Sequence, residues 1–350
     1  MSISKVAKLA GVSSSTVSRV INNHPRVAPD TITSVRKAMK ELNYVPSDRR
    51  PGPKPASRIR IGTGNIAFLV LGTSGERATP AFEDLLRGVS LGASQNELNL
   101  VFTHVPDAEH LPIRILDQRT DGVLLHGAAP GAELRKRLQR MPTVWLMGNR
   151  RRPEWGDQVM PDSYEIGDLA ARYLIERGHR RLAFLNLDAG HWAFRLYHQS
   201  FAAAAGELHA DVKTVQQASD VPTSDYWHRF GSESVEKLVH QFMQLMPRPS
   251  GLFVADDMQV ALIQPVLQAK GVELGPGRTE IISCNNEKPY LVGLSPRPAA
   301  IDIRVESIGR RGVEQLLWRL QHVDVPERIV ATIEPFIVKS DAALSEPSRG

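Results

Sequence analysis

A short stretch near the N-terminus carries hydrogen-bonding side chains at helical spacing. Residues 14–22 read SSTVSRVIN, and Val17, Val20 and Ile21 give this stretch one apolar face. The other face presents small hydroxyl and amide groups with one guanidinium, on Ser14, Ser15, Ser18, Arg19 and Asn22. Such groups match the donors and acceptors that base edges present in the major groove of DNA. The stretch therefore predicts a helix that contacts DNA bases.

Two further helices are expected to hold this one in place. Ser4 stands where an N-cap would begin a helix over VAKLA, and Gly11 ends that helix. Val12 and Ser13 then form a tight connection. A third helix begins near Pro29, and its apolar residues recur at helical spacing at Ile32, Val35, Ala38, Met39 and Leu42. Simple helical packing is the alternative, but the order of these elements favours an all-α helix-turn-helix module.

The charge of the chain is concentrated in this module. The formal net charge is +5, yet residues 1–60 hold 12 Lys and Arg against 3 Asp and Glu. The rest of the chain is acidic, with 31 basic against 35 acidic residues. A concentrated positive charge favours an anionic polymer as partner, through release of condensed counterions from phosphates. A solvated basic tail is the alternative, and the patterned sequence disfavours it.

The run from Val6 to Pro46 resembles the DNA-binding headpiece of the lactose-repressor (LacI/GalR) family. Its AGVS, TVSRV and NYVP pieces stand at the spacing of that family. The resemblance implies that Ser14 and Ser15 occupy the two positions that most affect the choice of operator. It also implies supporting contacts to bases or phosphates from Thr16, Ser18, Arg19 and Asn22. The operator sequence is not predicted, because two serines impose few bidentate constraints.

From Asn65 onward, short apolar runs rich in β-formers alternate with helix-length amphipathic segments. Examples are NIAFLVLG, DGVLLHG, RLAFLNL and GLFVAD. This alternation predicts α/β architecture with parallel, doubly wound sheets, in which ligands bind beyond the carboxyl ends of the strands. Residues 161–187, 251–274 and 299–320 also resemble the family. They imply a two-lobed, periplasmic-binding-protein-like domain in which the chain crosses between lobes three times.

These patterns predict four parts of the chain. We expect a headpiece at 1–46, a basic Pro-rich hinge at 47–62, an effector-binding and dimerisation domain at 63–340, and a disordered tail at 341–350. Within the third part, one lobe is expected over about 63–161 and 288–321, and the other over about 162–287 and 322–340. The tail lacks leucine heptads, so a homodimer is favoured over a tetramer.

The resemblance also implies residues for an effector site between the lobes. They are Phe82 as an aromatic wall, Asp162 at the crossover, Arg195 as the grip on a polar effector, Trp227 as a stacking aromatic, and Asn285. Each has a structural alternative: Phe82 and Trp227 as core residues, Asp162 as a helix N-cap and Arg195 in a surface ion pair. Asn285 replaces the aspartate usual in the family, and His198 replaces a usual glycine. Both departures imply an unusual effector, with a saccharide as the first hypothesis.

The hinge region departs most from the family. Members carry a hinge helix with a leucine that enters the minor groove, whereas this chain has SDRRPGPKPASRIR at 47–60. Pro51, Pro53 and Pro55 exclude an ordinary helix there. An extended basic arm in the minor groove is expected instead, contacting DNA through Arg49, Arg50 and Lys54. An inert spacer is the alternative.

No catalytic or metal-binding pattern is apparent in the sequence. The adjacent carboxylates Asp256 and Asp257 are expected to begin a helix after a strand, rather than to hold a metal ion. Cys284 is expected to be a buried, inert thiol. We therefore predict a non-enzymatic, cytoplasmic transcriptional regulator without a cofactor, in which two subunits bind a near-palindromic operator and a small polar effector alters DNA affinity. A constitutive architectural DNA-binding protein and a solute-binding transport protein are the alternatives.

Overall fold

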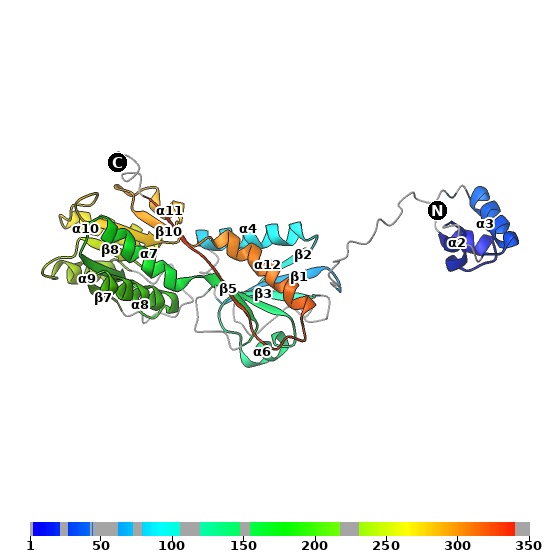
Figure 1. The fold of residues 1–350 in the computed structure, drawn as a ribbon, viewed down its shortest axis with the longest axis horizontal. Coiled ribbons are helices and arrows are strands. Elements are labelled where there is room, and N and C mark those ends of the chain that lie inside the picture. The colour runs from blue at the N-terminus through cyan, green and yellow to red at the C-terminus, as the bar shows by residue number, and fades with distance from the viewer. Residues whose placement is uncertain are drawn as a thin grey trace. The chain divides into compact units, whose positions relative to one another are not determined.

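The structure is a computed structural model that describes residues 3–21, 27–42, 44, 62–72, 79–105, 120–147, 155–217 and 231–339. The chain divides into two compact units, Met1–Arg58 and Ile59–Gly350. Figure 1 shows the elements of each unit. Within the described residues, no helix is long and apolar enough to cross a membrane.

The N-terminal unit is a three-helix module. Its helices are α1 (Ile3–Leu9), α2 (Ser14–Ile21) and α3 (Pro29–Glu41). Gly11 has a φ of +68°, a left-handed conformation that ends the first helix at low cost, as predicted. The predicted apolar stripes meet in one small core that contains Val6, Val17 and Val35. The helix-turn-helix prediction is thus confirmed in its local geometry.

The first lobe of the second unit is built on a six-stranded sheet in the order β11-β5-β4-β3-β1-β2, with every pairing parallel. Its strands are β1 (Asn65–Leu71), β2 (Asn99–Val105), β3 (Gly122–Gly127), β4 (Thr143–Leu146), β5 (Asp157–Pro161) and β11 (Val330–Ile333). Its helices are α4 (Pro80–Gln95), α6 (Ala132–Leu138) and α12 (Val305–Gln321). Strand β1 alternates its side chains between two cores, because successive residues face opposite sides of the sheet.

Helices α4 and α12 lie side by side in this lobe (Figure 1). Glycines make the close approach possible. A Cβ at Gly309 would lie 2.5 Å from the carbonyl oxygen of Leu85, and a Cβ at Gly88 would collide with the backbone of Glu306. The two helices therefore touch backbone to backbone, which larger side chains at either glycine would prevent.

The second lobe has a similar sheet in the order β12-β10-β9-β8-β6-β7, in which only β12 is antiparallel to its neighbour. Its strands are β6 (Arg181–Asn186), β7 (Asp211–Gln216), β8 (Gly251–Val254), β9 (Glu280–Cys284), β10 (Ala299–Asp302) and β12 (Phe336–Val338). Helices α7 (Ser163–Glu176) and α8 (Trp192–Glu207) cover one face. Helices α9 (Ser232–Met243) and α10 (Asp257–Ala269) cover the other, and the short α11 (Lys288–Leu291) packs on α10.

The chain crosses between the lobes after β5, after β10 and after β11. The first crossing agrees with the predicted change near residue 162. The other two differ from the predicted changes at about 288 and 322, because β10 pairs with β9 in the second sheet and β11 pairs with β5 in the first. The strand pattern alone did not reveal these partners, since pairing joins segments distant in sequence.

Candidate nucleic-acid interface and inter-lobe site

Helix α2 presents the predicted polar face. Ser14, Ser15 and Arg19 are exposed, whereas Thr16 is half-buried against the module. Ser18 lies in the same helix. Val17 and Val20 face the core, so packing fixes which side of the helix points outward. Asn22, Arg49, Arg50 and Lys54 lie outside the described residues.

Ser13, which the sequence analysis treated only as part of a connection, organises the start of α2. Its hydroxyl oxygen accepts from the backbone N–H of Thr16 at 3.2 Å, which caps the start of α2. It also shares hydrogen bonds with the hydroxyls of Ser15 at 2.7 Å and Thr16 at 2.9 Å. Ser13 therefore positions two of the predicted DNA-contacting side chains. A serine directly before the helix was the signal that could have identified it.

Six basic side chains of the three-helix module are exposed, on Lys5, Lys8, Arg19, Arg36, Lys37 and Lys40. Only Asp30 and Glu41 oppose them among the described residues of the module. Such an excess of positive charge attracts a polyanion and makes binding dependent on salt.

In the second unit, polar side chains gather at the carboxyl ends of the second-lobe strands. Asp256 follows β8 and caps α10, because its Oδ1 accepts from the N–H of Gln259 at 2.8 Å. The Gln259 side chain in turn accepts from the N–H of Leu187, just after β6, at 2.7 Å. The capping role predicted for Asp256 is confirmed. These hydrogen bonds hold the ends of β6 and β8 against the start of α10.

Glu287 joins this edge to the first lobe. Its Oε1 accepts from the backbone N–H of Ala81 at 3.0 Å, and its Oε2 accepts from Nδ2 of Asn285 at 3.2 Å. Ala81 is in the first turn of α4, so the second lobe supplies a capping carboxylate to a first-lobe helix. Only 8% of Glu287 is exposed. The sequence reasoning missed Glu287, because nothing local marks a contact that spans 206 positions.

The pKa values of Glu287 and of the neighbouring Asp257 are raised. Burial, followed by the charge of Asp256, raises the pKa of Glu287 to about 7. Burial also raises the pKa of Asp257 well above its usual range, although Asp257 accepts hydrogen bonds from the Ser283 hydroxyl and from the N–H of Glu287. Buried like charges disfavour ionisation. Burial and neighbouring negative charge therefore disfavour ionisation of Glu287 and Asp257.

The predicted ligand residue Asn285 lies at this edge, in a left-handed conformation with a φ of +101°. Asparagine tolerates that conformation better than most residues. Its backbone N–H donates to Ile301 at 2.8 Å, and its side-chain amide donates to Glu287. Asn285 thus positions Glu287 in this structure.

Phe82, which was predicted to form an aromatic wall of the effector site, packs into the core of the first lobe. It is 6% exposed, and its ring lies 6.2 Å from Phe68, 6.1 Å from Phe102 and 6.1 Å from His126, between centroids. The structure therefore gives Phe82 the core role that was the alternative to a ligand wall. A direct ligand contact by this ring remains a prediction.

Asp162 is the N-cap of α7, where its Oδ1 accepts from the N–H groups of Tyr164 at 3.1 Å and Glu165 at 3.2 Å. This is the alternative role foreseen for it. Arg195 is exposed on α8, and its guanidinium lies 5.3 Å from the ring centroid of Trp192. Neither residue is joined by a hydrogen bond to Asn285 or Glu287. Trp227 lies outside the described residues.

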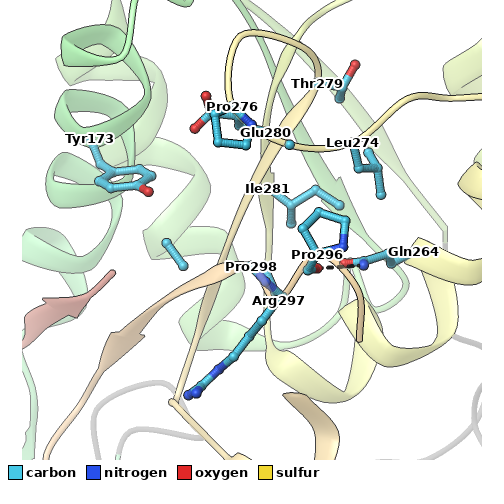
Figure 2. A pocket seen from close by; sticks show the side chains of 12 residues that line it. Tyr173, Gln264, Leu274, Pro276, Thr279, Glu280, Ile281, Pro296, Arg297 and Pro298 are labelled. Atoms are coloured by element: carbon cyan, nitrogen blue, oxygen red, sulfur yellow. Dashed lines mark hydrogen bonds between the residues drawn. The ribbon is translucent and has the colours of Figure 1, made fainter. Parts of the chain in front are cut away.

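A shallow depression lies at the other end of the second-lobe sheet (Figure 2). Its lining includes Tyr173, Gln264 and Arg297. Gln264 donates to the carbonyl oxygen of Pro296 at 2.9 Å, and Glu280 is paired with Arg177. The depression lies at the start of β9, so it is separate from the edge that carries Glu287.

Cys284 is buried and unpaired, as predicted, and burial raises the pKa of its thiol well above the usual range. It is therefore an inert thiol at ordinary pH. Throughout the described ranges, no group of three or more His, Cys, Asp or Glu side chains is arranged to hold a metal ion.

Comparison with known proteins decides the family. Residues 2–47 match the model for bacterial regulatory proteins of the lacI family, and residues 171–340 match the model for a periplasmic binding protein-like domain. The chain therefore carries the DNA-binding domain of the lacI family, followed by a periplasmic binding protein-like domain. It is a DNA-binding transcriptional regulator with a helix-turn-helix domain and a two-lobed α/β domain.

Relatives match this chain over nearly all of its length. It is 26% identical over 346 residues to the HTH-type transcriptional repressor PurR of Mannheimia succiniciproducens, covering 96% of each chain. Among solved structures, a complex of the transcriptional regulator CelR with cellobiose has 23% identity and a TM-score of 0.62, covering 98% of this chain and 99% of the other. A lac repressor dimer bound to operator and the anti-inducer ONPF has 18% identity and a TM-score of 0.62, covering 98% of each.

Proposed function

We propose that this lacI-family regulator is a homodimeric repressor that acts in the cytoplasm at a near-palindromic operator, without catalytic activity. The exposed polar face of α2, fixed by the core of the three-helix module, is the observation that carries this proposal. Dimer symmetry would present two such helices to two half-sites. Ser14 and Ser15 are proposed to affect the choice of operator most. Supporting contacts to bases or phosphates are proposed for Thr16, Ser18, Arg19 and Asn22.

The effector is proposed to be a small polar molecule, with a sugar or sugar derivative first. It binds between the lobes, at the edge where Asn285 and Glu287 approach the start of α4. The Asn285 amide can donate and accept hydrogen bonds, and the Glu287 carboxylate can accept them, which suits a ligand with many hydroxyl groups. The cellobiose complex of a regulator with the same fold supports this class. Asp162, Arg195 and Trp227 remain proposed contacts, together with the neighbourhood of Phe82.

Regulation requires that the effector bind the DNA-competent and DNA-incompetent states with different affinity. A purely architectural DNA-binding protein would show no such difference. The basic hinge is proposed to lie in the minor groove as an extended arm, through Arg49, Arg50 and Lys54.

A binding experiment separates these functions. The purified full chain is screened against saccharides by thermal shift, and its affinity for operator-like duplexes is then measured with and without each hit at physiological salt. A repressor of this kind binds one duplex at least ~1,000-fold more tightly than random DNA, and a hit changes that affinity. Equal affinity for both duplexes would refute sequence-specific regulation, and operator binding that no ligand alters would favour the architectural alternative.

A further inference from the structure

Three hydroxyl groups meet at the start of α2, on Ser13, Ser15 and Thr16. The Ser13 Oγ lies 2.7 Å from the Ser15 Oγ and 2.9 Å from the Thr16 Oγ1. It also accepts from the backbone N–H of Thr16 at 3.2 Å, and this N–H donates as well to the Ser13 carbonyl oxygen at 3.0 Å. Ser13 is therefore the hydrogen-bond partner that Ser15 and Thr16 share.

The Ser13 hydroxyl has one proton and two lone pairs for these partners. The N–H of Thr16 occupies one lone pair, so one lone pair and one proton remain for the two neighbouring hydroxyls. Each neighbouring oxygen lies at hydrogen-bond distance, and each hydrogen bond requires one proton between its two oxygens. Ser13 therefore accepts from one neighbour and donates to the other.

This division limits what Ser15 and Thr16 can offer to another molecule. The hydroxyl that donates to Ser13 has used its only proton, so it can only accept from a further partner. The hydroxyl that accepts from Ser13 keeps its proton and can donate it. Only one of the two side chains can therefore donate a hydrogen bond to DNA while the network is intact.

We infer that Ser13 is a positioning residue for DNA recognition, which leaves Thr16 free to donate to a phosphate and Ser15 able only to accept from a base. The inference rests on the proposed contacts of α2 with DNA. A free serine hydroxyl either donates or accepts, so it does not distinguish the amino group of A or C from the carbonyl oxygen of G or T. Ser15 held by Ser13 accepts from the amino group alone.

The assignment of the two roles follows from exposure and from the chemistry of the DNA backbone. Ser15 is exposed and Thr16 is half-buried. Base edges lie deep in the groove and phosphates flank it, so the more exposed side chain suits a base and the other suits a phosphate. Phosphate oxygens only accept, which requires Thr16 to keep its proton. Thr16 then accepts from Ser13, and Ser13 accepts from Ser15.

The full chain and a pool of duplexes with randomised sequence test this inference. Enrichment of the pool gives the duplex that wild type binds best, and Ser15→Ala identifies the base pair whose contribution depends on Ser15. Inverting that base pair exchanges its amino group and its carbonyl oxygen in the major groove. A further duplex lacks only the amino group of that base pair. Each loss of affinity is taken relative to the loss in Ser15→Ala, which removes the effect of other contacts.

Two variants of Ser13 are matched for the stability of α2. Threonine and glycine are about equally good at a helix N-cap, but only Ser13→Thr keeps a hydroxyl. Circular dichroism checks that both variants retain their helices. Thr16→Val releases Ser15 in a second way, because Ser13 then has a proton to give to Ser15.

Wild type and Ser13→Thr are expected to bind the inverted duplex roughly fivefold more weakly than the original, which is about the value of one hydrogen bond. Ser13→Gly and Thr16→Val are expected to bind both orientations about equally, since a released Ser15 donates to the carbonyl oxygen. Removal of the amino group is expected to weaken binding by wild type roughly fivefold.

An equal loss on inversion in Ser13→Gly and wild type would overturn the inference and leave Ser13 as a helix cap alone. Loss of the discrimination in Ser13→Thr would also overturn it, as would a wild type that is indifferent to the amino group. All three outcomes leave sequence-specific DNA binding intact. A pool from which wild type enriches no sequence would instead refute the inference and the proposed function together.

Discussion

Replacement of Arg319 by methionine should strongly destabilise the first lobe. Arg319 lies near the end of α12 and binds Asp157 of β5 in a bidentate manner, at 2.7 Å and 3.0 Å. It also donates to the carbonyl oxygens of Val325 at 2.6 Å and Glu327 at 2.8 Å. One side chain therefore fastens α12 and the segment leading to β11 onto the sheet.

The magnitude follows from the burial of this pair. Asp157 is 1% exposed and the Arg319 side chain 12% exposed, so methionine would leave an uncompensated buried carboxylate. Breaking such a pair costs about 3–5 kcal/mol. The matched variant Arg311→Met removes an exposed pair with Glu314 and one hydrogen bond to Gln315 on the same helix, but leaves the Asp157 carboxylate paired, and should cost about 1 kcal/mol.

Urea denaturation followed by tryptophan fluorescence measures both variants. Trp318, whose ring lies 5.1 Å from the Arg319 guanidinium, is one of the five tryptophans that contribute to the signal. Burial alone would raise the pKa of Asp157, but hydrogen bonds from Arg319, the Ile329 N–H and Gln315 outweigh it and lower the pKa. The pair therefore adds stability above the ordinary pKa of the carboxylate, and this stability is lost as pH falls through the lowered value. An Arg319→Met cost no larger than that of Arg311→Met would refute the reasoning.

Three further predictions concern the other parts of the chain. Ser13→Ala should lower the free energy of headpiece unfolding by about 1 kcal/mol in circular dichroism, because α2 loses its cap. In α7, Gly167→Ala would place a Cβ 2.6 Å from the Phe201 backbone nitrogen, so it should destabilise the protein by about 1–3 kcal/mol. In α8, a Cβ at Gly206 meets open space, so Gly206→Ala should stabilise the protein by up to about 1 kcal/mol. Thermal denaturation measures both variants. Replacement of Arg49, Arg50 and Lys54 in the hinge by alanine should weaken DNA binding most for A·T-centred operators and reduce the dependence of affinity on salt. An unchanged salt dependence would favour an inert spacer.

Local patterns in the sequence predicted what local forces decide. The three headpiece helices, strands such as β1 and β6, the cap at Asp256 and the buried Cys284 follow from periodicity, capping chemistry and hydropathy within a few residues. Strands at the edges of the sheets, which have a weak hydrophobic pattern, were harder to predict from the sequence. Strand β7 and strand β11 are short and mostly exposed or half-buried, so they carry little hydrophobic signal.

The long-range features of the site were not predictable in the same way. Sheet order places β10 beside β9 and β11 beside β5, and that order decides which lobe each segment joins. The contact of Glu287 with Ala81 depends on both lobes at once. Phe82 shows the related difficulty that an aromatic residue at a helix start has the same local pattern in a core as beside a ligand.

The glycine contact between α4 and α12 has a mechanical consequence. Around Gly88 and Gly309 the two helices are in backbone contact with no side chain between them to deform, so this part of the pair moves as one rigid unit, a single beam. The 16 residues of α4 make that beam roughly 24 Å long. A small movement of the start of α4, where Glu287 contacts Ala81, would therefore also move the far end of α4 and the part of α12 packed against it.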